Sequence, residues 1–164
     1  MQAKPASGFR LQHPRCVCYY DLYGRQEMFI GAHCRGGALD APHVRLSKMG
    51  EIVYRHIISG NHIPGICVDR FVIMPNHIHL ILRVDGNDTG GTMRAPSRTN
   101  AMIPHFVSTL KRFCHRDIGT TVFQRSYHDH VIRGEKDYQK IWEYIDTNPA
   151  RWEDDCFYEG PERL

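Results

Sequence analysis

The sequence predicts an α+β domain with a ferredoxin-like, split β-α-β arrangement, in which an antiparallel sheet is followed by an added C-terminal helix. Three observations support this prediction. Apolar runs alternate with segments of helical periodicity in the order β-α-β-β-α-β-α. Pro75-Asn76 joins two apolar runs, which is typical of an antiparallel hairpin. The length of 164 residues suits a single domain spanning 1–164 that buries most of its apolar surface.

The first half of the chain contains three expected strands and one helix. Residues 1–13 are polar and are expected at the periphery. Residues 15–22 form the first expected strand, with 28–30 as a short addition. Ser47 is suited to cap a helix that Gly60 should end. Strands are then expected over 66–74 and 77–84.

The second half begins with residues 85–100, which are rich in Gly, Thr, Ser and Asn and predict a long flexible loop. A helix is expected from about 103 to 116, followed by a fourth strand that includes 122–123 and 127–132. A third helix over 135–147 should stop before Pro149. Residues 153–164 are acidic and aromatic and are expected at the periphery.

Composition is that of a soluble globular protein, with 41% hydrophobic and 24% charged residues. The net charge of +3 is compatible with nucleic-acid binding but does not require it. No apolar stretch is long enough for a membrane span, and residues 1–10 lack the apolar core of a secretory signal. We therefore expect a cytoplasmic protein that makes no contact with a membrane.

Six cysteines in a cytoplasmic chain favour free thiols over disulfides. Cys16-x-Cys18 together with His33-Cys34 could form a four-ligand zinc site. The one-residue spacing of the first pair is shorter than zinc sites usually have. The alternative is that Cys16 and Cys18 are small apolar residues on the first strand.

His77 and His79 are the most informative residues of the chain. Because side chains alternate along a strand, the two imidazoles share one face of the sheet. The apolar runs on both sides of them predict a central strand. Two histidines held in this way can bind one divalent cation, or they can simply be hydrogen-bonded residues of the sheet.

Tyr144 and Asn148 stand four residues apart, on one face of the last predicted helix. If this helix lies across the open face of the sheet, Asn148 can bring an oxygen to the metal of His77 and His79 as a third ligand. Tyr144 would then lie beside the metal and act as the nucleophile. Nitrogen and amide ligands with open positions favour Mg²⁺ or Mn²⁺ over Zn²⁺. The alternatives are that Tyr144 packs in the core and that Asn148 caps the helix.

Three segments together resemble the single-tyrosine HUH transposases of the insertion-sequence-200-like family, which include the REP-associated tyrosine transposases. The segment 74–82 resembles their histidine–hydrophobe–histidine strand, and 123–133 resembles the part before their tyrosine helix. The segment 144–149 resembles their Tyr-Ile-x-x-Asn-Pro signature. The resemblance covers roughly residues 15–152, although 15–46 fit the family pattern poorly.

The resemblance implies cleavage and rejoining of single-stranded DNA at hairpin-bearing or palindromic ends, through a 5′-phosphotyrosine intermediate and without ATP. It implies Tyr144 as the nucleophile, His77 and His79 as metal ligands, and Asn148 as the third ligand. It also implies a protein of the nucleoid that acts as a monomer or a homodimer.

Basic residues supply candidate contacts to DNA. Lys111, Arg112 and Arg116 lie on the second predicted helix, although a solvated helix face would have the same composition. Other candidates are Arg94 and Arg98 in the long loop, and Arg125, His130 and Arg133 around the fourth strand. His128-Asp-His130 is a second His-x-His motif, but its polar neighbours and its place on an edge strand argue against a metal site.

Three functional classes remain open at this stage. The first is a metal-dependent DNA strand transferase. The second is a histidine-triad nucleotide hydrolase, which would need a further histidine where Leu80-Ile81 stand. The third is a nucleic-acid-binding module or an inactive, domesticated transposase. Such a module usually exposes stacking aromatics on its central strands, and the histidine strand offers none beyond Phe71.

Overall fold

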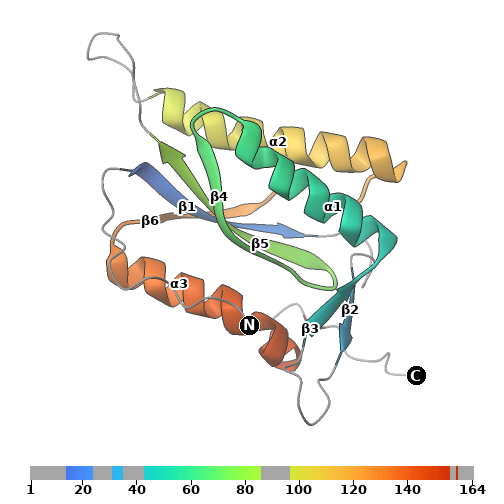
Figure 1. Cartoon of the computed structure of the whole chain (residues 1–164). Helices are drawn as coiled ribbons and strands as arrows, with labels where there is room; N and C mark the ends of the chain where they lie inside the picture. The colour runs from blue at the N-terminus through green and yellow to red at the C-terminus, as the bar shows by residue number, and fades with distance from the viewer. Residues whose placement is uncertain (1–13, 24–30, 35–42, 86–96, 156–157, 159–164) are drawn as a thin grey trace.

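The computed structural model describes residues 14–23, 31–34, 43–85, 97–155 and 158 (Figure 1). Its main element is a four-stranded antiparallel sheet with strand order β4-β5-β1-β6. The strands are β1 (Pro14–Tyr23), β4 (Ile66–Ile73), β5 (His77–Asp85) and β6 (His128–Ile132). Strands β1 and β5 are central and β6 lies at an edge, so the predicted ferredoxin-like α+β fold is confirmed.

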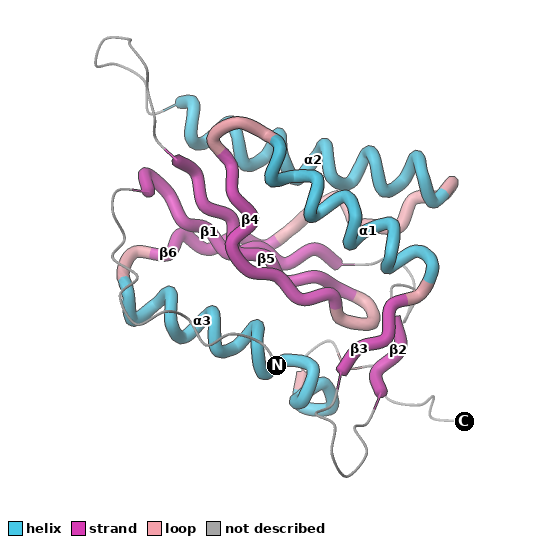
Figure 2. The backbone as a smooth tube through the Cα atoms, viewed as in Figure 1, coloured by secondary structure: helices cyan, strands magenta, loops and turns pink. Residues whose placement is uncertain are grey.

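The helices cover the two faces of this sheet unequally (Figure 2). Helices α1 (Lys48–Ser59) and α2 (Ser97–Ile118) lie side by side on one face, and α3 (Glu135–Thr147) lies on the other. The short 3-10 helices are η1 (Gly60–His62) and η2 (Asn148–Asp154). Strands β2 (Gly31–Cys34) and β3 (His43–Leu46) form a separate two-stranded sheet that the sequence pattern did not predict.

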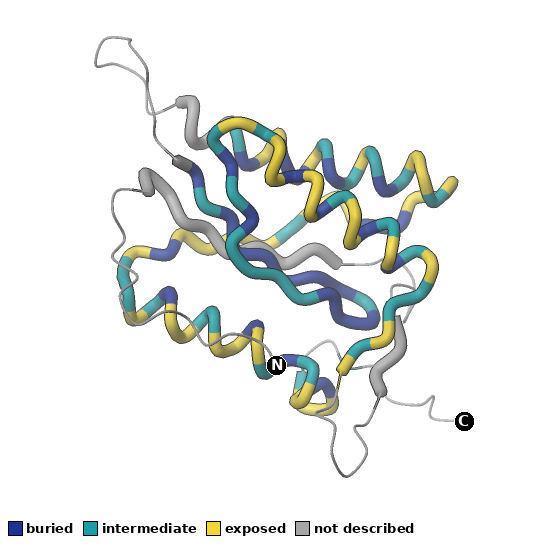
Figure 3. The backbone as a smooth tube through the Cα atoms, viewed as in Figure 1, coloured by how far each residue is buried: buried dark blue, intermediate teal, exposed yellow. Residues whose placement is uncertain are grey.

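Strand β5 divides its side chains between the two faces, as the period of two requires. Ile78, Leu80 and Leu82 enter the main core beneath α1 and α2. Ile81 enters a smaller core beneath α3, and His77 and His79 share its face of the sheet. Among the strands whose burial is described, β5 is the most continuously buried (Figure 3). A central, buried strand therefore carries the histidine pair.

Helix α1 begins after Ser47 and ends at Gly60, as the sequence indicates, but Gly60 is needed for packing rather than for a left-handed cap. The Oγ of Ser47 accepts a hydrogen bond from the backbone N–H of Gly50 at 3.1 Å. Gly60 ends the helix with ordinary right-handed backbone angles, rather than the left-handed ones of a capping glycine. A Cβ atom at Gly60 would lie 2.4 Å from Cε2 of Phe106, so close packing requires the glycine.

Most other expected elements are confirmed, and the differences have physical causes. Helix α2 begins at Ser97, so residues 97–100 are helical although their polar composition suggested a loop. Val122 and Phe123 belong to no strand; they are apolar because they fill the main core. Residues 28–30 lie outside the described residues. None of the helices in the described part of the chain combines the length and apolar character needed to cross a membrane.

Candidate active site

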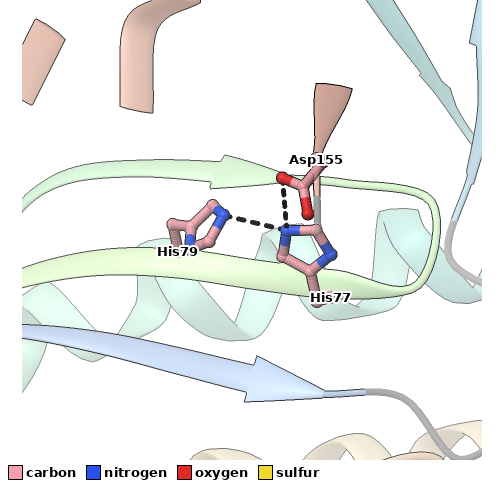
Figure 4. A group of neighbouring side chains, drawn as sticks. All are labelled: His77, His79 and Asp155. Carbon is pink, nitrogen blue, oxygen red and sulfur yellow. Dashed lines mark hydrogen bonds and ion pairs between the residues drawn. The ribbon is translucent and has the colours of Figure 1, made fainter. Parts of the chain in front are cut away.

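The rings of His77 and His79 converge on one point above the sheet (Figure 4). Their Nε2 atoms are 2.8 Å apart, and the side chains are 0% and 1% exposed. Nδ1 of His77 donates to Oδ1 of Asn76 at 2.8 Å, because a carboxamide oxygen can only accept. With the proton on Nδ1, the Nε2 atom of a neutral His77 carries a lone pair, which a metal ligand requires. This atom faces the second imidazole.

Asn148 also lies beside the histidine pair, and it comes from the end of α3. It follows the last residue of α3, is 3% exposed, and places its Nδ2 atom 3.2 Å from Nε2 of His79. Its Oδ1 atom is buried and accepts no hydrogen bond within the described part of the chain. A buried oxygen without a donor is costly, and a cation can satisfy it. The predicted proximity of Asn148 to the histidines is therefore present in the structure.

Asp155 is a fourth neighbour that the sequence interpretation did not include. Its Oδ2 atom lies 3.7 Å from Nε2 of His77, and its side chain is 2% exposed. His77, His79 and Asp155 offer ligand atoms within 4.8 Å of one another. Asp155 directly follows η2 and lies in the segment that was expected at the periphery. No periodicity or motif distinguishes it from Asp154, so the sequence carried no signal for it.

Tyr144 lies on α3 beside this cluster. Its ring centroid is 5.2 Å from that of His79, in an edge-to-face arrangement. The residue is 40% exposed, so solvent reaches a tyrosine that stands next to buried imidazoles. Trp152 of η2 packs near the other imidazole, with its ring centroid 5.9 Å from that of His77. The tyrosine helix and η2 thus flank the histidine pair.

These residues fit a divalent cation. Ligands at about 2.1 Å that are 90° apart are separated by about 3.0 Å, and tetrahedral ligands by about 3.4 Å. The 2.8 Å between the imidazole nitrogens is nearer to the octahedral value. The site also offers a carboxylate and a buried amide oxygen, which are hard donors. His77, His79 and Asp155 could therefore hold a divalent metal, with Asn148 adjacent.

The basic residues divide between the two faces of the molecule. Nζ of Lys111 donates to the carbonyl oxygens of Gln124, Arg125 and Ser126 at 2.7, 3.3 and 3.1 Å. Burial lowers the pKa of this ammonium group. Arg112 and Arg116 are exposed on α2 and contact the ring of Phe113. Since α2 and α3 cover opposite faces of the sheet, these residues lie away from the histidines.

A second basic group lies on the side of α3. Nε2 of His130 pairs with Oδ2 of Asp137 at 2.9 Å, and this hydrogen bond holds the pKa of the carboxyl below its usual range. Arg133 is exposed just after β6, and its backbone N–H donates to Asp137 of α3. Arg125 is exposed before β6, where its carbonyl oxygen accepts from Lys111 of α2. His128 stands on β6 in register with Asp21 of β1, which is in turn paired with His79. Arg98 lies in the first turn of α2, and Arg94 lies outside the described residues.

The cysteines of the proposed zinc alternative lie on two separate sheets. Cys16 and Cys18 belong to β1, and His33-Cys34 belong to β2. Cys114 is buried on α2, and burial raises the pKa of its thiol to about 12. An unreactive thiol in the core fits the expectation of reduced cysteines for this position.

Several known proteins are similar to this chain, whereas no protein-family model matches it. A REP-associated tyrosine transposase, solved bound to a REP hairpin, superimposes with a TM-score of 0.57 at 19% identity, covering 87% of this chain and 72% of that one. This likeness shows a common fold. A candidate transposase from Deinococcus radiodurans R1 gives a TM-score of 0.42 at 14% identity, covering 90% and 97%, which is too low to support an inference.

A comparison of sequences finds a relative with higher identity than these two structures. A protein of Haemophilus influenzae is 35% identical over a 148-residue alignment, which covers 68% of this chain and 80% of the relative. That relative is described as an uncharacterized protein. Identity at this level over most of the relative reflects common descent rather than a shared fold alone. The chain therefore belongs to the same protein family as this uncharacterized Haemophilus influenzae protein.

Proposed function

We propose that the protein is a metal-dependent tyrosine transposase that cleaves and rejoins single-stranded DNA at hairpin-bearing or palindromic sites. The observation that carries the proposal is the convergence of a partly exposed Tyr144 on the buried pair His77 and His79. The fold shared with a REP-associated tyrosine transposase bound to a REP hairpin supports it. Structural histidines and a core tyrosine would not require a buried amide oxygen and a carboxylate at the same point.

In the proposed reaction, the hydroxyl oxygen of Tyr144 forms a bond to the scissile phosphorus. The bond from phosphorus to the 3′-oxygen of the neighbouring nucleotide breaks, and the proton of the phenol passes in net terms to that oxygen. The products are a 5′-phosphotyrosine and a free 3′-OH. Attack of a 3′-OH on the phosphotyrosine reverses these changes and joins a strand, so no ATP is consumed.

The proposed ligands of the metal are His77, His79 and Asn148, with Asp155 as a fourth donor that supplies the negative charge. Rotation of the Asn148 amide by half a turn exchanges its two terminal atoms and brings the oxygen beside His79. Mg²⁺ or Mn²⁺ suits this donor set, and the bound ion would supply charge stabilisation to the scissile phosphate. A phenol has an ordinary pKa of about 10, so Tyr144 needs such help near neutral pH.

We propose a monomer or a homodimer, and the presence of the tyrosine and all four donors on one chain supports a site that a monomer can complete. We place the DNA on the side of α3, where His130 and Arg133 can meet phosphates, with Arg94, Arg98 and Arg125 as further contacts. Arg112 and Arg116 would bind a second part of the hairpin on the opposite face. A protein of this kind acts in the cytoplasm, at the nucleoid.

The test is the capture of the covalent intermediate. Single-stranded DNA from the gene's own flanks, labelled at either end, is incubated with the protein and Mn²⁺ or Mg²⁺ and resolved on a denaturing protein gel. We expect label on the protein only with metal, and only for fragments that keep their label 3′ to the cut. Tyr144→Phe should bind the same DNA without forming the adduct.

Two outcomes of this test count against the proposal. An adduct with Tyr144→Phe would refute the assigned nucleophile. Tyr158→Phe is the matched control and should form the adduct, because Tyr158 contacts the ring of Trp152 rather than the histidine pair. Tight DNA binding without any adduct from any flanking hairpin would instead favour a nucleic-acid-binding module or an inactive, domesticated transposase.

A further inference from the structure

Strand β4 contains one extra residue opposite β5. The ladder pairs Val68 with Leu82 and then Arg70 with Ile81, so the register shifts at Asp69. In such a β-bulge two residues of one strand oppose one residue of the other, and the local twist changes the directions of their side chains. Here two consecutive residues, Asp69 and Arg70, both contact α3, which a regular strand would not allow.

The first contact fixes the N-terminal half of α3. The hydroxyl of Tyr138 donates to Oδ2 of Asp69 at 2.7 Å. The other oxygen of this carboxylate lies 3.9 Å from Nη1 of Arg83, on β5. Tyr138 is buried, and burial followed by the hydrogen bond to Asp69 raises the pKa of its phenol. The phenol therefore stays neutral and remains a donor at neutral pH.

The second contact, made by Arg70, fixes the C-terminal half of α3 at two residues that flank Tyr144 in the sequence. Nη2 of Arg70 forms an ion pair with Oδ1 of Asp146. The same guanidinium lies over the ring of Trp142, 4.6 Å from its centroid. Trp142 and Asp146 are four residues apart, so they stack on one face of the helix. One arginine thus contacts the residues two before and two after the tyrosine.

These polar contacts matter because, among the residues whose side chains are described, the apolar core beneath α3 is the smaller of the two. Among the described residues, the core beneath α3 has four buried members, Ile81, Ile132, Tyr138 and Ile145, against sixteen in the core beneath α1 and α2. A helix held by a small apolar contact can shift along its axis, and one turn corresponds to about 5.4 Å. An error of about 1 Å in the attacking atom can cost on the order of 100-fold in rate.

We infer that the β4 bulge positions the nucleophile helix, and that Arg70 is the positioning residue that aligns Tyr144 with the histidine pair. The inference rests on the proposed function, because it concerns the placement of the proposed nucleophile. Arg70 contacts Trp142 and Asp146, the residues two before and two after Tyr144, and its effect on the tyrosine passes through them.

The test compares Arg70→Gln with Arg151→Gln, which removes an exposed ion pair to Asp154 from the neighbouring η2. Two quantities are measured: the rate of adduct formation at saturating DNA, and amide hydrogen exchange in α3 and α1. We expect Arg70→Gln to slow adduct formation about 10- to 100-fold with unchanged DNA affinity. We also expect faster exchange over 139–148, with α1 unchanged. Arg151→Gln should behave like the wild type.

Two further variants separate positioning from general stability. Arg70→Lys keeps the charge but loses the planar group over Trp142, so its rate should lie between those of Arg70→Gln and the wild type. The exchanged pair, Arg70→Asp with Asp146→Arg, should recover part of the lost rate. Recovery by a reversed ion pair would not occur if the positive charge of Arg70 itself bound the DNA.

Each result decides a separate point. Unchanged amide exchange in α3 of Arg70→Gln would refute the anchoring of the helix, whether or not the protein cleaves DNA. Faster exchange with an unchanged adduct rate would leave Arg70 a structural residue and overturn its positioning role. Absence of an adduct from the wild-type protein would refute the proposed function, while the exchange data would still test the anchoring.

Discussion

Replacing Asp155 by asparagine should weaken divalent-metal binding strongly, because it removes the charge of the site and keeps its shape. The carboxylate lies 3.7 Å from Nε2 of His77, and the ligand atoms of His77, His79 and Asp155 all lie within 4.8 Å of one another. A cation held among these three atoms is therefore within about 4 Å of the carboxylate. A unit charge and a divalent ion at about 4 Å attract by about 2 kcal/mol even with the dielectric constant of water. A loss of about 2 kcal/mol corresponds to roughly 30-fold in affinity, and the buried environment of Asp155 makes this a lower bound.

Titration calorimetry with Mn²⁺ measures this effect without DNA or catalysis. Asp154→Asn is the matched control, since its side chain is 73% exposed and pairs with Arg151 at the surface. We expect the control to change affinity by less than about twofold, as is usual for exposed charges. His77→Ala should abolish binding. Equal affinities for Asp155→Asn and Asp154→Asn would refute the assignment of Asp155 to the metal site.

Three further predictions concern packing, pH and the basic residues. Gly60→Ala should destabilise the fold by about 1–3 kcal/mol in urea denaturation, because the new Cβ meets the buried ring of Phe106; Gly134→Ala meets no atom within 4 Å and serves as the control. Burial raises the pKa of Tyr138, so its contribution to stability, taken as wild type minus Tyr138→Phe, should be constant below pH about 10 and decline above it. Lys111→Met should cost about 1–3 kcal/mol of stability while DNA affinity at constant salt stays the same.

The sequence predicted the sheet and its main helices because their signals are local. The helix over 135–147 has the bounds of α3, and the strands before and after Pro75-Asn76 are β4 and β5. Apolar periodicity identified both, since each element buries one face against a core. Helix α2 was predicted too short, because its first turn has no apolar stripe, and β2 and β3 were missed because their four-residue strands have no distinct pattern.

The same reasoning explains how much of the site could be predicted. His77, His79, Tyr144 and Asn148 were identified through spacing, which places residues on a common face within one strand or one helix. Their meeting across elements depends on how α3 crosses the sheet. The predicted topology supplied the face of the sheet but could not supply the contacts that set the angle of the helix.

The place of Asp155 beside His77 and the β-bulge at Asp69 could not be predicted from local sequence patterns. A β-bulge breaks the period of two on which a strand is recognised, so Asp69-Arg70 reads as a polar interruption of an apolar run. In the structure this interruption carries the contacts that hold the tyrosine helix. Asp155 comes close to His77 only because η2 turns the chain back after Asn148. Departures from a regular pattern beside a candidate site are therefore the positions where mutagenesis should begin.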